Sequence, residues 1–457
     1  MKHLQKNAVK DLTSGNLVRN FVVFAAPLVL AGLLSQAFNL LDLVIAGQFL
    51  GEQGVAAVGA TSSLITFYSS VFWGFGSGFA IFVAHLFGAR RFPDIRRAIR
   101  TNLAVMLIGG IVLSGVLLLF REPLFDLLRV KPEIRRDAMR YFAIVLAGGI
   151  LPAMNNACIH ILNAMGCSSF PFFVSLVVAV CNISGNILTV AVLDLGVAGL
   201  AIATLLSAAV GLLCYLCKIH SCLRSLGLEK ERFTLDAHSL TMAFRYSLPN
   251  MAQQTVMYTA GLLISGIVNN ISVSATAAYA VATQVYDVSA NVYQNSSKTV
   301  SNYVAQCNGA GKVRQIPKGL LLGLVQGLAF VALPLSVSCM FGESVCGLFF
   351  RQKGSAEAVA LAVLFTSRYL PFLELNLLNN LFHAFFRGMG SRVWLLLATT
   401  LGAAVRVLSS FPLAAARGIE GVYLGWVISW AVEAVFSVCV YFLFYHKKLR
   451  AGQEMYL

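Results

Sequence analysis

Charged side chains are scarce in this sequence of 457 residues: Asp, Glu, Lys and Arg make up 12% of it, whereas soluble globular domains carry about 25%. Acids are the rarer part of that share, with 19 Asp and Glu against 34 Lys and Arg. Hydrophobic residues account for 58% of the chain. This composition excludes an ordinary soluble domain and indicates an integral membrane protein.

Several functional motifs are also missing. The sequence has no GxxxxGK[ST] phosphate loop, which argues against direct drive by ATP. Its seven histidines do not form a metal-binding pattern, and its ten cysteines show no secreted disulfide framework. We find no converging nucleophile, base and metal ligands, so we expect no enzyme activity and no cofactor. The net charge of +15 does not predict nucleic-acid binding, because the basic residues lie in short connectors and termini.

Long apolar runs dominate the chain instead. A helix needs roughly 20 apolar residues to cross a hydrocarbon core of about 30 Å. Twelve segments meet this requirement, so we predict an all-α integral membrane fold with twelve transmembrane helices. The predicted spans are 21–44, 55–83, 101–120, 141–163, 170–193, 196–217, 246–269, 275–304, 318–340, 359–385, 393–415 and 422–445.

The basic residues indicate the orientation of these spans. Most of the 34 Lys and Arg lie in the termini and in the even-numbered connectors. Because cytoplasmic loops are rich in Lys and Arg, this predicts a multi-pass protein of the cell membrane with both termini in the cytoplasm. Connector 121–140 is the exception, with six basic residues on the predicted outer side. Its interspersed acids also suit an amphipathic helix on the membrane surface.

The sequence repeats itself after slightly less than half of its length. "AHLFGARR" at 84–91 resembles "AQCNGAGK" at 305–312, and "MNNACIHILNAMG" at 154–166 resembles "LNNLFHAFFRGMG" at 378–390. The repeat predicts two pseudo-symmetric lobes of six helices each.

We place the N-terminal lobe at residues 1–225 and the C-terminal lobe at 226–457. Six spans return the chain to its starting side, so the two lobes must share one orientation. An axis along the membrane normal then relates them, with a substrate cavity between them near the midplane. Such an architecture suits alternating access.

Asp42 is the only ionisable residue between Arg19 and Glu52. Placing an ionised acid at the bilayer centre costs roughly 2.5 to 3.5 kcal/mol, so intramembrane acids face the bundle interior and are functional candidates. Helical spacing places Ser35 and Asn39 on the same face as Asp42. The alternative is that Asp42 only marks the outer end of the first span, where water is near.

A polar stripe runs along the eighth predicted span, at steps of three and four residues. We expect it to face a wet cavity. Asp287 in this stripe either recognises a cationic substrate or pairs within the bundle through Lys298. Gln253 and other polar residues of the seventh span are expected to line the same space. The predicted substrate-cavity residues are Gln254, Tyr258, Gln284, Asp287, Asn291 and Glu374.

Two further features of the C-terminal half concern structure. Arg406 and Glu433 lie inside predicted spans without an obvious local partner. Because buried charges in lipid pair with one another, we expect an ion pair between them. Pro152 and Pro371 stand inside predicted spans and are expected to kink or hinge these helices.

The order and spacing of several motifs resemble the multidrug and toxic compound extrusion (MATE) transporters, over nearly the whole chain. The motifs are "PLVLAGLLSQAFNLLDLVIAGQFLG", "FGARR", "GVAGLAIAT", "SLPNMAQQ", "QCNGAGK" and "FFRGMG". The resemblance implies an exporter of the cytoplasmic membrane, with twelve helices in two V-shaped lobes. It also implies exchange of a cationic or amphiphilic compound for Na⁺ or H⁺.

The resemblance further implies a coupling-ion site in the N-terminal lobe. An acid on the first helix takes the ion in this family, and Asp42 matches it. Where the family carries a second Asp, on the fifth helix, this chain has Asn186. Because a hard cation prefers charged oxygen ligands, the missing carboxylate favours a proton over Na⁺. The predicted coupling-ion residues are Asp42, Asn39, Asn182, Asn186 and Thr204.

Our leading hypothesis is therefore a secondary antiporter, acting as a monomer in the lipid bilayer, that exports a small cationic or amphiphilic compound. A lipid-linked oligosaccharide flippase of the same superfamily is the alternative. We would expect a basic cavity for its pyrophosphate, and often extra spans. The exported compound and the choice between H⁺ and Na⁺ stay open.

Overall fold

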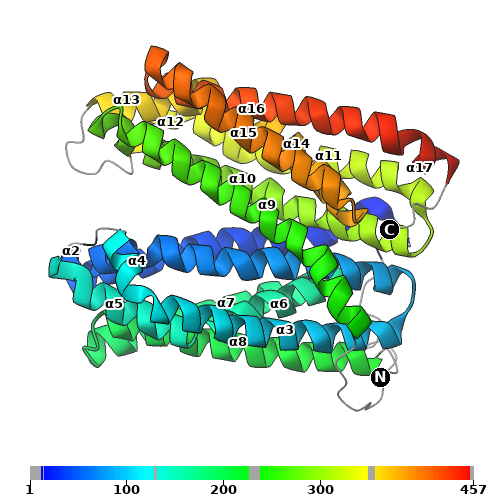
Figure 1. Cartoon of the computed structure of the whole chain (residues 1–457), viewed down its shortest axis with the longest axis horizontal. Coiled ribbons are helices and arrows are strands. Elements are labelled where there is room, and N and C mark those ends of the chain that lie inside the picture. The colour runs from blue at the N-terminus through cyan, green and yellow to red at the C-terminus, as the bar shows by residue number, and fades with distance from the viewer. Residues whose placement is uncertain are drawn as a thin grey trace. The chain divides into compact units, whose positions relative to one another are not determined.

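A computed structural model describes residues 12–13, 15–127, 130, 132–225, 237–347 and 356–452 of the chain. Every regular element in these residues is a helix (Figure 1). A helix satisfies its backbone hydrogen bonds internally, which is what a segment surrounded by hydrocarbon requires. The predicted all-α membrane fold is confirmed.

The chain divides into two compact units. Unit 1 contains Leu33–Met251, and unit 2 contains Leu12–Gly32 and Ala252–Leu457. The divisions fall inside two helices, α2 (Leu17–Gly88) and α9 (Ala237–Asn269). Each half of the chain thus contributes the start of its first helix to the other unit.

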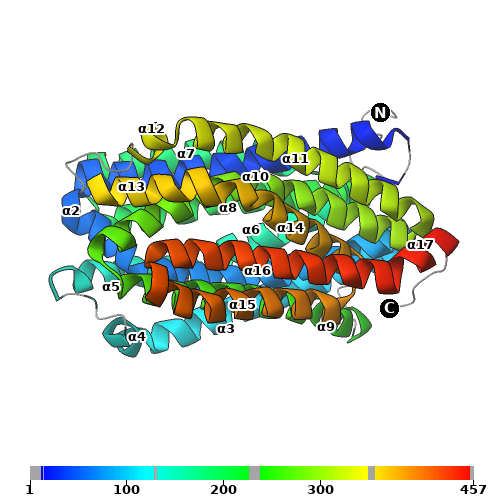
Figure 2. The same cartoon turned by 90° about the horizontal axis from the view of Figure 1, so that it is seen from above.

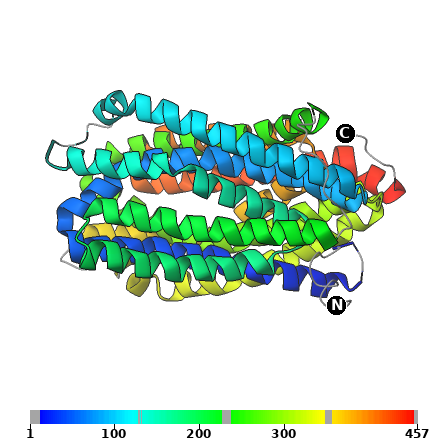
Figure 3. The ribbon, with the colours of Figure 1, turned by 90° about the horizontal axis from the view of Figure 1, so that it is seen from below.

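Helix α2 contains two predicted spans. Its 72 residues would reach about 108 Å as a straight helix, far more than the roughly 30 Å of a hydrocarbon core. The blue ribbon of α2 turns back on itself in Figure 3. Two segments of it, Leu17–Gln36 and Leu64–Gly88, are each apolar and long enough to cross a membrane.

The further regular elements in the described residues of unit 1, up to the start of α9, are also helices. They are α3 (Phe92–Leu119), α4 (Arg121–Leu127), α5 (Pro132–Ala147), α6 (Ile150–Ala164), α7 (Ser169–Asn186), the π-helical turn η1 (Ile187–Val192) and α8 (Val197–Ser225).

The fourth predicted span is broken, but not at its proline. Helices α5 and α6 meet at a bend of 47°. The break holds Gly148 and Gly149, where an added Cβ would lie 2.4 Å from Leu205 and 2.9 Å from the Tyr68 hydroxyl, respectively. Pro152 stands in the first turn of α6, where a missing N–H costs little. The kink predicted at Pro152 is therefore produced by the two glycines before it.

Unit 2 holds the second set of helices. After α9 its elements are α10 (Val273–Gly309), η2 (Val313–Gln315), α11 (Ile316–Met340), α12 (Gly342–Gly347), α13 (Ala356–Leu364), η3 (Phe365–Tyr369), η4 (Leu370–Phe372), α14 (Leu373–Gly388), α15 (Arg392–Arg417), α16 (Ile419–Val440), η5 (Tyr441–His446) and α17 (Lys447–Ala451). Helices α15 and α16 run side by side (Figure 2). Pro371 lies in η4, a 3₁₀ turn directly after the π-helical turn η3, so the distortion predicted there is present.

The described residues provide the twelve spanning helices of the predicted fold. Nine helices in the described part of the chain are long and apolar enough to cross a membrane, and the bent pair of α5 and α6 makes ten. Helices α9 and α10 complete the twelve. They carry the polar residues of the seventh and eighth predicted spans, which explains why they are not among the apolar ten.

The repeat is visible in the backbone where helices end. Gly166 and Gly390, which occupy equivalent positions in the two halves of the sequence, have φ of +86° and +70°. In each case the amide after the glycine donates a hydrogen bond of 2.8 Å to the carbonyl five residues earlier. This is the left-handed C-terminal cap that favours glycine. Arg90 and Gly311 form a second matched pair, with φ of +57° and +68°.

The repeat is also visible in how helices pack. Asn155 Nδ2 donates to the Ala208 carbonyl at 2.8 Å, and Asn379 Nδ2 donates to the Trp430 carbonyl at 3.0 Å. The two asparagines occupy equivalent positions of the repeat, and so do the two acceptors. The same side chain thus joins equivalent helices in both units, α6 to α8 and α14 to α16.

Candidate functional site

The first candidate site is a small polar cluster in unit 1. Asn182 Nδ2 on α7 donates to Thr204 Oγ1 on α8 at 3.3 Å, and Asn186 Nδ2 donates to Asn182 Oδ1 at 3.1 Å. Asn186 is fully buried, and Asn182 is 8% exposed. The structure therefore brings together three of the predicted coupling-ion residues. Asp42 and Asn39 lie on α2, but their side chains are outside the described part of the structure.

The backbone beside this cluster is distorted. The π-helical turn η1 starts directly after Asn186, and such turns are frequent at functional sites. Thr189 Oγ1 in this turn donates to the carbonyls of Gly185 (2.8 Å) and Gly199 (2.9 Å). These bonds fix α7 against α8. The cluster offers neutral amide and hydroxyl groups, which can relay a proton but lack the charge that a cation site needs.

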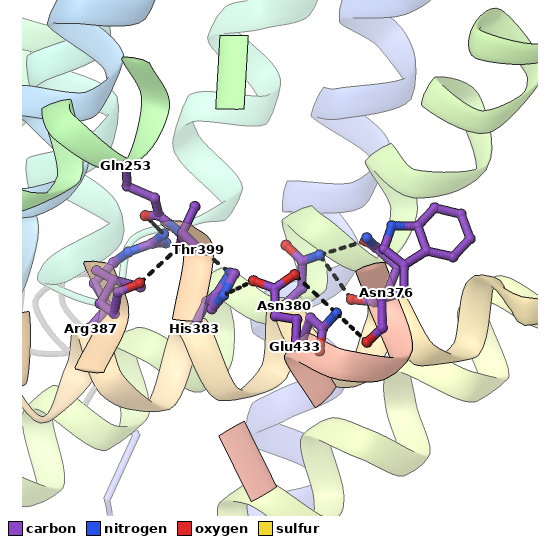
Figure 4. A network of polar contacts seen from close by, with 10 residues as sticks. Gln253, Asn376, Asn380, His383, Arg387, Thr399 and Glu433 are labelled. Atoms are coloured by element: carbon purple, nitrogen blue, oxygen red, sulfur yellow. Dashed lines mark hydrogen bonds and ion pairs between the residues drawn. The ribbon is translucent and has the colours of Figure 1, made fainter. Parts of the chain in front are cut away.

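The second candidate site is a buried ion pair in unit 2, shown in Figure 4. His383 Nε2 on α14 lies 2.9 Å from Glu433 Oε1 on α16, and both side chains are 10% exposed. The two atoms are close but not aligned as a hydrogen bond. Asn379 Nδ2 donates to the other carboxylate oxygen of Glu433 at 3.2 Å. The buried Glu433 carboxylate thus has one paired side chain and one hydrogen-bond donor, which offset the cost of removing it from water.

The ion pair continues into a chain of polar contacts that reaches α9 and α15. Gln253 Nε2 on α9 lies 3.4 Å from His383 Nδ1 and 3.2 Å from Thr399 Oγ1. Arg387 donates to Gln253 Oε1 at 3.1 Å. His383 thereby joins α9, α14 and α16.

Helix α14 supplies most of this network from one face. Its polar residues follow helical steps at 376, 380, 383 and 387. Asn380 Nδ2 donates to Asn376 Oδ1 at 2.9 Å, and Tyr293 of α10 donates to the same oxygen at 2.6 Å. Glu374 stands in the first turn of α14 and is exposed, apart from these contacts.

The predicted ion pair between Arg406 and Glu433 is wrong. Glu433 pairs with His383, whereas the Arg406 guanidinium lies over the Trp426 ring, 3.7 Å from its centroid. Trp426 and Glu433 are seven residues apart on α16, about 10 Å along the axis. The arginine therefore packs on a ring roughly two turns away from the acid.

Other predicted residues are spread along α9 and α10. Asp287 is exposed, and about 16 Å of helix separates it from Lys298. Lys298 instead donates to Asn295 Oδ1 at 2.6 Å, and Asn295 donates to Asn291 Oδ1 at 2.7 Å. Pairing of Asp287 through Lys298 is thus not what the structure shows. Gln254 and Gln284 are partly buried, and Tyr258 is 44% exposed.

Several residues of the unit 2 network were not predicted as site residues, among them His383, Arg387 and Thr399. The histidines show no metal-binding pattern along the sequence, and in the described residues no group of three or more His, Cys, Asp or Glu could hold a metal ion. A different signal was present in the repeat. The residue that aligns with His383 is Ile159, and the one that aligns with Glu433 is Gly211. The ion pair therefore exists only in the second half.

The fold and its polar sites define a multi-pass helical membrane protein built by duplication. A model of the MatE family matches residues 27–188 and 249–411, which together cover more than half of the chain. The chain belongs to this family, whose members are the MATE transporters that its sequence resembles. One matched segment lies in each half of the chain, in agreement with the internal repeat.

Named relatives align over most of their length. The chain is 23% identical to the "Probable multidrug resistance protein YoeA" of Bacillus subtilis, over 94% of each chain. It is 25% identical to the "FAD transporter" of Shewanella oneidensis, over 89% of each chain. A solved outward-facing structure of a multidrug resistance MATE family transporter has a TM-score of 0.89 at 20% identity, covering 96% of this chain and 98% of that one.

Proposed function

We propose that this protein is an ion-coupled antiporter of the cell membrane, with both termini in the cytoplasm, that exports a small amphiphilic compound by alternating access. Family membership supports export, and a relative with a multidrug resistance name supports the compound class. The observation that carries the proposal is the buried contact of Asn182, Asn186 and Thr204. These residues and Asp42 form the proposed coupling site, with Asn39 beside them.

The cluster suits a proton better than Na⁺. Its described members are neutral, so Asp42 is the one proposed carboxylate. A carboxylate that is alternately protonated and ionised changes the charge of unit 1. A ligand shifts a two-state equilibrium only through a difference in affinity for the two states, and this charge supplies such a difference.

The test is transport by purified protein in liposomes. Ethidium efflux is measured under an imposed pH gradient and, separately, under a Na⁺ gradient, for wild type, Asp42→Asn and the exposed-acid control Glu343→Gln. We expect efflux that follows the pH gradient, is lost in Asp42→Asn and is kept in Glu343→Gln. Equal efflux by Asp42→Asn would remove Asp42 from the mechanism.

A second candidate function is export of an anionic aromatic compound. The spanning helices of unit 2 hold several basic side chains, among them the partly buried Lys298, Arg387 and Arg406, and a relative is named FAD transporter. The same liposomes loaded with a flavin nucleotide distinguish the two candidates. Release of the flavin without movement of ethidium would favour the anion. A labelled lipid-linked pyrophosphate that changes leaflet, with neither solute moving, would favour the flippase.

A further inference from the structure

The repeat places Arg406 at the position of the unit 1 polar cluster. Helices α7 and α15 correspond in the alignment of the two halves: Ser175 Oγ donates to the Pro171 carbonyl at 2.9 Å, and Thr399 Oγ1 donates to the Leu395 carbonyl at the same distance. On this alignment Asn182 corresponds to Arg406.

Helices α8 and α16 correspond in the same way. Gly199 lies against the Thr189 carbonyl, and Gly421 lies against the Leu413 carbonyl. On this alignment Thr204 corresponds to Trp426. The contact between Asn182 and Thr204 in unit 1 is therefore replaced in unit 2 by the contact between Arg406 and Trp426.

Aromatic rings pack around Trp426, the ring on which Arg406 lies. Tyr279 and Tyr286 of α10 pack edge-on against Trp426, with ring centroids 5.8 and 5.1 Å away, and Tyr286 stacks on Trp430 at 5.8 Å. Trp426 and Trp430 are 2% and 3% exposed. Faces of such rings attract a cation. The place beside Trp426 thus suits a positive charge, and the Arg406 side chain occupies it.

Charge and hydrogen bonding agree with this assignment. The carboxylates that interact electrostatically with Arg406 are Asp287 on α10 and Glu433 on α16. The Arg406 Nε is buried without a hydrogen-bond partner, and so is Ser410 Oγ, whose residue aligns with Asn186. The guanidinium is therefore held by rings and by distant charge rather than by a direct ion pair.

We propose that Arg406 is a built-in cation that fills, in unit 2, the position corresponding to the ion site of unit 1. Unit 2 then binds no exchangeable ion at this position, and one ion couples transport, through unit 1. The inference rests on the proposed function for its meaning in transport. Its structural claim is that a cation-binding position lies beside Trp426, and this claim can be tested without a transport measurement.

The test uses intrinsic fluorescence, because Trp426 lies directly against Arg406 and the chain has only four tryptophans. Purified Asp42→Asn protein, which lacks the unit 1 acid, is compared with double variants that add Arg406→Asn or Arg406→Lys. The probes are Na⁺ at constant ionic strength, stepwise acidification, and millimolar guanidinium. We expect a saturable change in tryptophan fluorescence in the Arg406→Asn variant, which carries at 406 the residue that unit 1 has at the aligned position 182. We expect no such change when residue 406 is Arg or Lys. Adding Trp426→Phe should abolish the change.

Two results would overturn the proposal. One is an Arg406→Asn protein that melts like its parent and responds to none of the three probes. The other is an Arg406→Lys protein that responds as Arg406→Asn does. If Arg406→Asn does not fold, the test is made on the wild-type protein. The number of ions exchanged per substrate is measured from the membrane potential that balances transport. We expect one ion per substrate, and two or more would exclude a single coupling site. If the wild type shows no efflux but the Arg406→Asn fluorescence change is observed, the proposed function is wrong and the inference about Arg406 stands.

Discussion

His383 and Glu433 form a buried ion pair that joins α14 to α16, and the first half of the chain has Ile159 and Gly211 at the equivalent positions. Duplication gave the two halves one framework of contacts. Differences between aligned positions therefore show where the second half acquired its own chemistry. Arg406, which aligns with Asn182, is another such difference.

The ion pair predicts an asymmetric response to mutation. His383→Leu leaves a buried carboxylate without its cation, so we expect a loss of about 3 kcal/mol in unfolding free energy. Glu433→Gln replaces the buried carboxylate by a neutral amide that can still hydrogen-bond, so it should cost only about 1 kcal/mol. Melting curves in detergent measure both, with exposed Glu343→Gln as control. Equal losses for the two variants would contradict the pairing.

The matched asparagines provide an internal comparison. Asn155→Ala removes one hydrogen bond to a carbonyl and should cost about 1 kcal/mol. Asn379→Ala removes the equivalent bond and also the contact with Glu433, so the loss should be about twice as large. The difference should shrink when Glu433→Gln is added. Chemical unfolding of the wild type, Asn379→Ala, Glu433→Gln and the double variant completes a double-mutant cycle for this contact.

Close helix packing in unit 1 depends on glycine. A Cβ at Gly78 would lie 2.5 Å from the Tyr246 carbonyl oxygen, and Ser247 Oγ of the same segment donates to the Phe75 carbonyl at 2.9 Å. Gly78→Ala must therefore move α9, and we expect a loss of about 2 kcal/mol in stability. Gly266→Ala, which meets no atom within 4 Å, should be neutral or raise stability by up to about 1 kcal/mol. Thermal unfolding of both variants is the measurement.

The unit 1 cluster predicts a change in ion affinity rather than in stability. Asn182→Ala removes the group that joins Asn186 to Thr204. We expect the ion concentration for half-maximal efflux to rise about tenfold, equivalent to about 1.4 kcal/mol. Ser175→Ala on the same helix, whose hydroxyl donates to the local Pro171 carbonyl, should keep the wild-type value. A common shift in both variants would point to a general effect on α7.

Much of the fold was predictable, because apolar length and repeated motifs fix helices and their register. The contacts of Asn182 with Asn186 and Thr204 were anticipated as a site through the family resemblance. The partner of Glu433 was not, because spacing along the chain does not say which neighbouring helix presents a partner. His383 and Arg406 were both candidates, and only packing places the histidine beside the acid.

The π-helical turns and the position of the bend at Gly148 were also not predicted from the sequence. Proline is an obvious signal for a kink, so Pro152 drew the prediction. The glycine pair acts through space instead, since it admits Leu205 and Tyr68 against the backbone. Such a cause depends on another helix and is invisible in local sequence.

The division of α2 and α9 between the units has an evolutionary consequence. Each unit is completed by the opening segment of the other half's first helix. A half-length chain with the same pattern would lack that segment when alone, and two copies would each supply it to the other. Such an ancestor would be a domain-swapped dimer, which fusion of two genes would convert into a single polypeptide.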